Sequence, residues 1–108
     1  MRLYHNPRCS KSRQAYALLQ QHGIEFEEYR YLDIGISQED IELLVNLEDV
    51  IRLSDISDKS EYDLSSKTEI RRLLQTEPKS LQRPILISNG KAVIGRPPEN
   101  ILTLLHGI

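Results

Sequence analysis

The spacing of hydrophobic residues changes several times along the chain, and each change predicts a new element. RLYHN, residues 2–6, predicts a short strand with Leu3 turned inward. From Ser10 the pattern becomes helical, because apolar residues recur at steps of three and four, and Gly23 is a natural stop. Alternation of apolar and charged residues in EFEEYRYL, residues 25–32, predicts a second strand. The recurring residues of the helix are Ala15, Leu18, Leu19 and His22.

The middle of the chain has a weaker pattern. Ser37 with Asp40 three residues later has the form of a capping box, so a helix is predicted to start at Ser37. The polar segment LEDVIRLSDISDKSEYDLSS, residues 47–66, predicts irregular or short helical structure. Residues 68–76 then predict another helix. The inward-facing residues of the two helices would be Ile41, Leu44, Val45, Ile70, Leu73 and Leu74.

The last part of the chain predicts a hairpin and a helix. In RPILISNGKAVIG, residues 83–95, two β-type runs flank Asn89-Gly90, a pair that suits a tight type I′ turn because both positions accept positive φ. Pro97 and Pro98 open a helix that Gly107 ends. The order of elements predicts an α/β fold, a small mixed sheet with helices on both faces, and residues 1–108 are expected to form a single domain. The buried face of the last helix would be Ile101, Leu102, Leu104 and Leu105.

Composition narrows the possible functions. The formal net charge of −2 gives no basic footprint for nucleic acid. Apolar runs fall short of the ~18 residues that a membrane helix needs, and the N-terminus lacks the pattern of a secretory signal. A single cysteine cannot form an internal disulfide, which favours a reducing cytoplasmic location. Cysteine and histidine spacings match no metal-ligand pattern, so no metal is expected.

The single cysteine, Cys9, lies where the first strand is predicted to pass into the first helix. Free N–H groups and partial positive charge gather at a helix N-terminus and stabilise an anion such as a thiolate. Arg8, Lys11 and Arg13 add positive charge nearby. This position predicts a lowered pKa and a nucleophilic role for Cys9. A buried, inert cysteine beside a solvated basic surface remains the alternative interpretation.

Two kinds of cysteine chemistry are excluded by the neighbouring residues. Position 12 is Ser12, so the chain lacks the second thiol of a dithiol redox motif. The fifth and sixth residues after Cys9 are Gln14 and Ala15, so the arginine of the tyrosine phosphatase loop is absent.

HNPRCSKSR, residues 5–13, has histidine, cysteine and arginine at four-residue steps and resembles the motif of glutaredoxin-dependent arsenate reductases. Arg83-Pro84-Ile85 and Gly95-Arg96-Pro97-Pro98-Glu99 agree with the same family. The resemblance implies a thioredoxin-like fold, with a mixed four-stranded sheet and a helical insertion between its halves. It also implies that the cysteine thiolate attacks arsenate, that glutathione as co-substrate displaces the adduct, and that glutaredoxin resolves the mixed disulfide. No bound cofactor is implied, and we expect a monomer.

Carried over by position, the resemblance makes Cys9 the nucleophile and Arg83 and Arg96 the oxyanion-binding residues. A planar guanidinium suits this role because it donates two parallel, charge-assisted hydrogen bonds. Alternatively, Arg83 only fixes extended backbone before a proline, and Arg96 is a surface residue before a helix. Four residues are expected to support the site. His5 would tune the pKa of the thiol, and Lys11 and Arg13 would add positive electrostatic potential or recruit glutathione. The peptide bond before Pro84 is expected to be cis.

One feature of the family is missing. Arsenate reductases carry a third arginine in the insertion, whereas Ser57 or a neighbour stands at that place here, with Arg52 and Lys59 nearby. Two other functions therefore remain open: a non-enzymatic regulator like the Spx-type proteins that bind RNA polymerase, and a glutathione-dependent thiol reductase for another substrate. Ser12 argues against an Spx-like redox switch, because that position lacks a cysteine.

Overall fold

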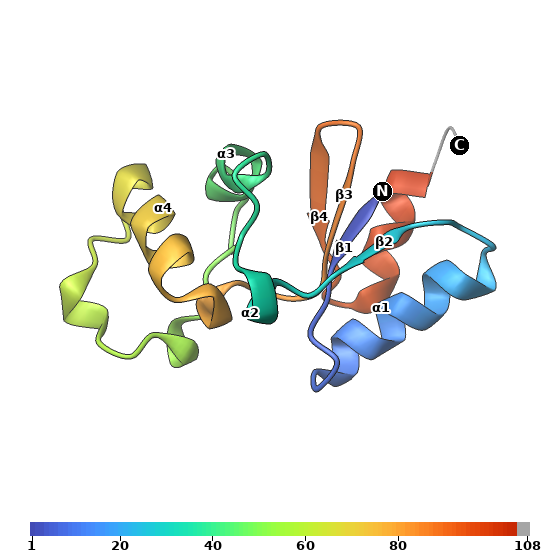
Figure 1. The fold of residues 1–108 in the computed structure, drawn as a ribbon, viewed down its shortest axis with the longest axis horizontal. Coiled ribbons are helices and arrows are strands. Elements are labelled where there is room, and N and C mark those ends of the chain that lie inside the picture. The colour runs from blue at the N-terminus through green and yellow to red at the C-terminus, as the bar shows by residue number, and fades with distance from the viewer. Residues whose placement is uncertain (106–108) are drawn as a thin grey trace. The chain divides into compact units, whose positions relative to one another are not determined.

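The computed structural model of the protein describes residues 1–105, and its backbone divides into two compact units. The sheet unit consists of Met1–Arg30 together with the chain from Arg83 onward, and the inserted unit is Tyr31–Gln82. Figure 1 shows the sheet and α1 in the first unit and the short helices of the second. The helical insertion between two halves of a sheet is therefore present, while the expectation of a single domain over residues 1–108 stays a prediction.

The strands of the sheet unit lie in the order β2-β1-β3-β4. β1 is parallel to β2 and antiparallel to β3, and β4 is antiparallel to β3. In this register the carboxyl ends of β1, β2 and β4 and the amino end of β3 meet at one edge of the sheet. The predicted α/β class with a mixed four-stranded sheet is confirmed. The elements of this unit are β1 (Arg2–Tyr4), α1 (Ser10–Gln21), β2 (Glu27–Tyr29), β3 (Ile85–Ser88), β4 (Lys91–Ile94) and the 3₁₀ helix η4 (Pro98–Leu105).

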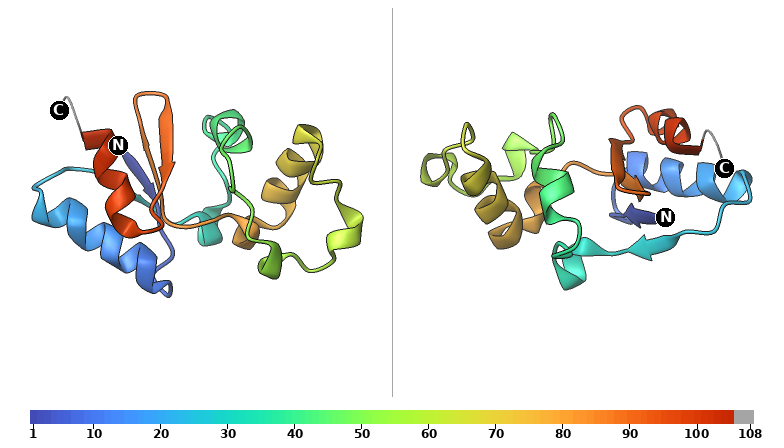
Figure 2. Two further views of the ribbon diagram at one scale, coloured as in Figure 1. Left: turned by 180° about the vertical axis from the view of Figure 1, so that it is seen from behind. Right: turned by 90° about the horizontal axis from the view of Figure 1, so that it is seen from above.

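A small apolar core joins the sheet to α1 and η4, which lie side by side in Figures 1 and 2. Its central residues are fully buried, and they come from the sheet, α1 and η4. Burying a side chain of leucine or isoleucine size contributes about 1.5–3 kcal/mol, so this cluster fixes both helices on the sheet. The central residues are Leu3 and Leu86 from the sheet, Ala15 and Leu19 from α1, and Ile101 from η4.

Most of the predicted elements of this unit are confirmed, with three corrections. The second strand is shorter than predicted, since Tyr31 and Leu32 begin the helix α2 (Tyr31–Ile34). Asn89 and Gly90 have φ values of 52° and 74°, as the type I′ turn requires. His22 is exposed and does not belong to the buried face of α1. The last helix begins at Pro98 as predicted, but it is a 3₁₀ helix. The prediction that Gly107 ends it lies outside the described residues.

The inserted unit is built from short helices, as its polar sequence predicts. The helix predicted at residues 68–76 is present, with Leu73 and Leu74 fully buried. The helix predicted to start at Ser37 begins at Ile41, with Asp40 as its N-cap, because residues 38–40 form a turn closed by the Asp40 N–H and the Ser37 carbonyl at 3.0 Å. The elements are α2 (Tyr31–Ile34), α3 (Ile41–Val45), η1 (Leu53–Asp55), η2 (Lys59–Glu61), α4 (Lys67–Thr76) and η3 (Pro78–Ser80).

Candidate active site

The topology of the sheet brings three distant segments to the same edge. Cys9 follows β1, Arg83 precedes β3, and Arg96 follows β4. The strand register brings these segments together, because Ile85 pairs with Tyr4 on one side and with Ile94 on the other. As a result, Nη2 of Arg96 lies 3.6 Å from Sγ of Cys9, although 87 residues separate them in the sequence.

Cys9 occupies the N-cap position of α1, where the backbone is extended, with φ −90° and ψ 123°. Its N–H donates to the carbonyl of Asn6 at 3.0 Å, and its carbonyl accepts the N–H of Arg13 at 3.0 Å. Cys9 is only partly buried. An N-cap side chain normally accepts hydrogen bonds from the second and third helical N–H groups, which here belong to Lys11 and Ser12. The sulfur therefore stands where a helix favours a negative charge.

The pKa of the Cys9 thiol lies below its ordinary value even though burial alone would raise it. The backbone N–H groups of Ser12 and Lys11 are the largest influences that oppose burial, although the sulfur makes no capping hydrogen bond of normal geometry, and the Arg83 side chain and the charge of Arg96 add to their effect. The direction of the shift and the part played by the helix N-terminus agree with the sequence prediction, but the contributing cations are not the predicted ones. Lys11 acts through its backbone, and the arginines that lower the pKa are far away in sequence.

Arg96 is held in place by the backbone of Arg83. Nε of Arg96 donates to the Arg83 carbonyl at 2.9 Å, which leaves Nη2 to face the sulfur. The peptide bond between Arg83 and Pro84 is cis, which confirms the expectation for Pro84. The N–H of Gly95 donates to the Pro84 carbonyl at 2.8 Å.

Gly95 permits this close approach. A Cβ at residue 95 would lie 2.8 Å from Cγ of Pro84 and 3.1 Å from Cγ2 of Ile101. The first distance is shorter than real contacts allow, so a side chain here would displace Pro84 or the backbone that carries Arg96. Glycine is therefore required for the geometry of the site.

His5 and Ser12 form a buried pair beside Cys9. Oγ of Ser12 lies 2.6 Å from Nδ1 of His5 and accepts the N–H of Asn6 at 3.0 Å. Burial lowers the pKa of His5 below its usual range. In the sequence, Ser12 is notable only as the place of an absent cysteine. Its buried position could have been found from spacing, because Ser12, Ala15 and Leu19 follow at steps of three and four and are the buried residues of α1.

The predicted site residues divide into two groups. Cys9, Arg83 and Arg96 meet at one sheet edge, and Pro84 and His5 lie at the same edge. The side chains of Lys11 and Arg13 are exposed, and Nη1 of Arg13 donates to the carbonyl of Pro7 at 3.0 Å. The structure thus gives Arg13 a role in closing the loop. The chemical role assigned to each residue stays a prediction.

The inserted unit supplies no further arginine at the expected place. The N–H of Ser57 donates to the carboxylate of Glu77 at 3.0 Å, and Nε of Arg52 pairs with Asp55 at 3.0 Å. Within residues 1–105, no three His, Cys, Asp or Glu side chains gather to hold a metal ion. The helices described for those residues include none that is long and apolar enough to span a membrane.

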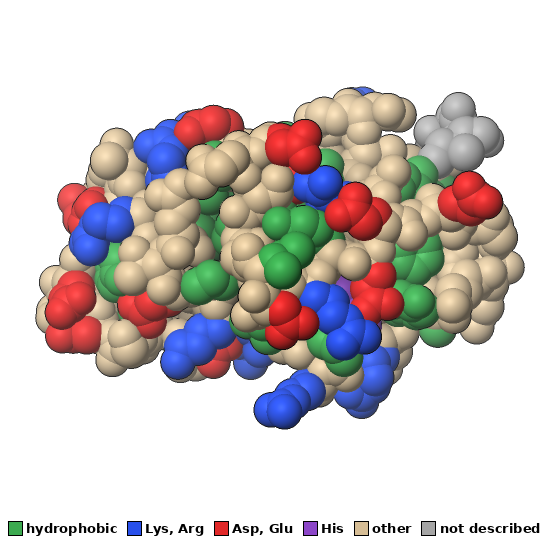
Figure 3. Space-filling model, viewed as in Figure 1, with side chains coloured by type: hydrophobic (Ala, Val, Ile, Leu, Met, Phe, Trp, Pro, Cys, Tyr) green, Lys and Arg blue, Asp and Glu red, His purple; other side chains and the backbone are tan. Residues whose placement is uncertain are grey.

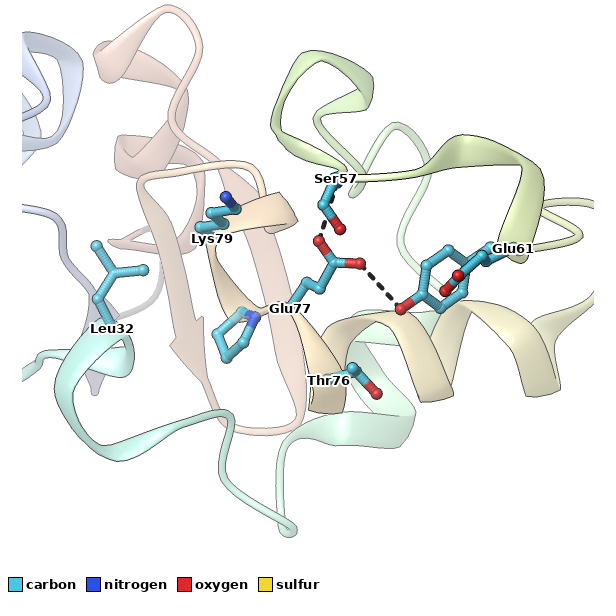
Figure 4. Close-up of a pocket in the computed structure, with 8 residues that line it drawn as sticks. Leu32, Ser57, Glu61, Thr76, Glu77 and Lys79 are labelled. Atoms are coloured by element: carbon cyan, nitrogen blue, oxygen red, sulfur yellow. Dashed lines mark hydrogen bonds between the residues drawn. The ribbon is translucent and has the colours of Figure 1, made fainter.

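A second polar cluster lies in the inserted unit, in a pocket of about 580 Å³ (Figure 4). Its centre is Glu77, whose carboxylate also accepts the hydroxyl of Tyr62 at 2.9 Å. These hydrogen bonds join the loop at Ser57 to the end of α4, and the Ser57 N–H is the largest cause of the lowered pKa of Glu77.

On the face shown in Figure 3, acidic and basic side chains are interspersed, in keeping with a net charge near zero.

The sheet edge therefore holds a partly exposed cysteine whose thiolate is favoured, flanked by two guanidinium groups. Attack on a tetrahedral oxyanion requires an anionic nucleophile and positive groups that bind the oxyanion, and this site has both. Arginine forks donate to such an ion in parallel pairs.

The ArsC family profile matches residues 4–104 of this chain. A protein of Escherichia coli (strain K12), named "Uncharacterized protein YfgD", is 36% identical over 118 residues that cover 97% of this chain and 96% of that protein. The "Arsenate reductase" of Neisseria meningitidis serogroup A is 34% identical over 114 residues, covering 97% of each.

The solved structure of an arsenate reductase from Vibrio cholerae superposes with a TM-score of 0.76 at 32% identity, covering 95% of this chain and 97% of the other. This likeness confirms the predicted thioredoxin-like fold. The matches also extend to a regulator: the global transcriptional regulator Spx of Streptococcus mutans is 27% identical over 95% of this chain and 81% of its own length.

Proposed function

This chain belongs to the ArsC family, and its similarity to arsenate reductases supports a role as a thiol-dependent reductase. We propose that it reduces arsenate to arsenite with glutathione and glutaredoxin, using Cys9 as the nucleophile. One observation carries the proposal: Nη2 of Arg96 stands 3.6 Å from the Cys9 sulfur. A guanidinium at that distance both favours the thiolate and lies where an incoming oxyanion would meet the nucleophile.

The reaction begins with attack of the Cys9 thiolate on arsenic. A sulfur–arsenic bond forms, and one arsenate oxygen leaves as water after taking up protons. A glutathione thiolate then attacks the Cys9 sulfur, and the sulfur–arsenic bond breaks with its electron pair left on arsenic, which releases arsenite and leaves a Cys9–glutathione disulfide. A thiol of glutaredoxin takes over the glutathione and frees the Cys9 thiolate, and a second glutathione restores glutaredoxin. Arsenic gains two electrons in passing from the +5 to the +3 state, and two thiols lose them in forming a disulfide. The net reaction converts arsenate and two molecules of glutathione into arsenite, oxidised glutathione and water.

The protein groups contribute by holding charge. Arg83 and Arg96 bind the oxyanion and offset repulsion between it and the thiolate, and the first N–H groups of α1 favour the charged sulfur before attack. Since the chain has one cysteine, the resolving thiols must come from outside. This requirement fits glutathione and glutaredoxin as partners of a monomer in the reducing cytoplasm.

A regulator of the Spx type is the second candidate, supported by the similarity to the Streptococcus mutans protein. Against it stand two observations: position 12 is a serine, and Arg83 and Arg96 both act on the Cys9 sulfur. A surface that only binds another protein does not need two arginines directed at one cysteine sulfur. A glutathione-dependent reductase for another oxidised substrate would use the same residues, so the choice of arsenate needs a direct test.

The test is a coupled assay in which NADPH oxidation is followed with arsenate, glutathione, glutaredoxin and glutathione reductase. We expect turnover that depends on arsenate and is lost in Cys9→Ser. The matched control is Ser60→Ala, in the inserted unit, which should keep its activity. Absence of arsenate-dependent turnover from the folded wild-type protein with several glutaredoxins would contradict the proposal.

A further inference from the structure

The proposed reaction leaves Ser12 without a role, although its surroundings are unusual for a serine. Its side chain has 0% exposure in the first turn of α1. The hydroxyl contacts His5 and the N–H of Asn6, while the backbone N–H of the same residue acts on the Cys9 sulfur. Ser12 therefore connects the loop before Cys9 with the group that stabilises the thiolate.

The directions of these hydrogen bonds follow from counting protons. The N–H of Asn6 can only donate, so Oγ of Ser12 accepts it at 3.0 Å. The single hydroxyl proton then needs an acceptor, because a buried donor without one is costly. Nδ1 of His5, at 2.6 Å, provides that acceptor when the imidazole is neutral and carries its proton on Nε2.

A charged His5 would break this arrangement. Its Nδ1–H would become a second donor toward Oγ of Ser12, and the hydroxyl proton would lose its acceptor. The imidazole is only 5% exposed, and its ring lies 5.1 Å from that of Tyr16, which further encloses it. Geometry and burial both favour the neutral form.

The charged groups around His5 do not reverse this conclusion. Burial is the largest influence and lowers the pKa of His5. The carboxylate of Glu28 acts in the opposite direction, and the guanidinium groups of Arg30 and Arg13 reinforce burial. The pKa stays below its ordinary value of about 6.5, so the ring is neutral at pH 7.

We propose that Ser12 is a positioning residue for the Cys9 thiolate. A neutral His5 and the Asn6 N–H fix its hydroxyl, and so keep the first turn of α1 in place with its N–H groups directed at the sulfur. His5 contributes through this contact and not through a positive charge. The inference rests on the proposed use of Cys9 as a nucleophile, but it concerns how the sulfur is held, whatever the sulfur attacks.

The experiment is the pH dependence of Cys9 alkylation by iodoacetamide, followed by mass spectrometry on folded protein. In Ser12→Ala the thiolate fraction at a pH below the wild-type thiol pKa should fall on the order of tenfold, equivalent to about one pKa unit. His5→Ala should have a similar effect. The double variant should be no slower than either single one, because both act along one path.

His5→Gln separates the neutral role from the charged one. Glutamine cannot carry a positive charge, but its amide oxygen can accept the Ser12 hydroxyl. We expect His5→Gln to keep most of the wild-type alkylation rate. A loss as large as that of His5→Ala would overturn the inference, as would a wild-type pH profile in Ser12→Ala.

Ser80→Ala provides a matched control, because Ser80 is also fully buried and its hydroxyl donates to the Glu77 carbonyl at 2.7 Å in the inserted unit. It should leave the alkylation profile unchanged, and an equal shift would reduce the Ser12 effect to general destabilisation. If Ser12→Ala does not fold, the comparison of His5→Ala with His5→Gln still tests the inference. Alkylation needs no arsenate, so the two proposals can fail separately. If the alkylation shifts are found but arsenate is not turned over, the proposed function is refuted and this inference stands.

Discussion

Cys9 in the sheet unit and Glu77 in the inserted unit each have a lowered pKa, yet they differ in what surrounds the anion. Glu77 is held mainly by the Ser57 N–H and the Tyr62 hydroxyl, neutral donors that join a loop to a helix end, and the charge of Lys79 makes a smaller contribution. Cys9 is acted on by helix N–H groups and by Arg83 and Arg96. A lowered pKa therefore does not by itself mark a reactive group.

The difference lies in how many donors remain for a ligand. A guanidinium has five N–H donors, and Arg96 uses Nε for the Arg83 carbonyl and Nη2 for the sulfur. Adding an oxyanion beside Cys9 is therefore possible without breaking the contacts that hold the site. The carboxylate of Glu77 is engaged by the Ser57 N–H and the Tyr62 hydroxyl, which is consistent with a structural role.

The largest expected effect distinguishes the two anions directly. Cys9→Ser should abolish reductase turnover, a loss of at least about a thousandfold, because a neutral hydroxyl cannot replace the thiolate as nucleophile. Glu77→Gln should retain most of the wild-type kcat. Turnover is measured with the coupled NADPH assay, and substantial activity in Cys9→Ser would contradict the comparison.

Next in size are the arginine variants. Arg83→Ala and Arg96→Ala should each weaken arsenate binding by about 1.5–3 kcal/mol, or roughly ten- to more than a hundredfold, through loss of a charge-assisted contact. Arsenate affinity can be measured by calorimetry on Cys9→Ser protein to prevent chemistry. Arg71→Ala is the control, since Arg71 pairs with Glu42 in the inserted unit. Unchanged affinity in both site variants would remove their proposed role.

A smaller effect is expected at the glycine that lets the segments meet. Gly95→Ala should destabilise the protein by about 1–3 kcal/mol, because the added methyl overlaps Pro84. It should also weaken arsenate binding by displacing Arg96. Urea unfolding together with arsenate titration checks both effects. Gly90→Ser is a useful comparison, since it strains the hairpin turn, where φ is 74°, without adding contacts at the site.

The smallest expected effect is that of Glu77→Gln on the stability of the protein. The folded pKa of Glu77 is lowered, so its stabilising contribution is present above its unfolded pKa of about 4.3 and is lost as pH falls through the folded pKa. Glu77→Gln should lower the urea midpoint at pH 7, and the gap to wild type should narrow on acidification. A constant gap across pH 3–7 would show that the charge of Glu77 does not matter.

The sequence predicts those parts of the molecule that depend on local signals. The Asn89-Gly90 turn, the start of α1 and the cis Pro84 follow from short motifs or from the family resemblance. The start of α3 lies four residues after the one that the capping-box spacing at Ser37 predicts, because the N-cap of the helix is Asp40.

Contacts between distant segments could not be predicted in the same way. The 3.6 Å approach of Arg96 to Cys9 depends on the register of β1, β3 and β4. The helix N-terminus at Cys9 could be predicted from the sequence, but the cations that lower its pKa are the distant Arg83 and Arg96 and not the side chains of Arg8, Lys11 and Arg13. Ser12 was overlooked because its contacts with His5 appear only when the loop is folded.

The most direct test of the account is the pH at which wild-type Cys9 becomes half thiolate, obtained from thiolate absorbance near 240 nm on folded protein. We predict a midpoint clearly below the ~8.5 of a free cysteine, with an upward shift in Arg96→Ala. A midpoint at or above that of the free amino acid would contradict the claim that this sheet edge holds Cys9 as an anion.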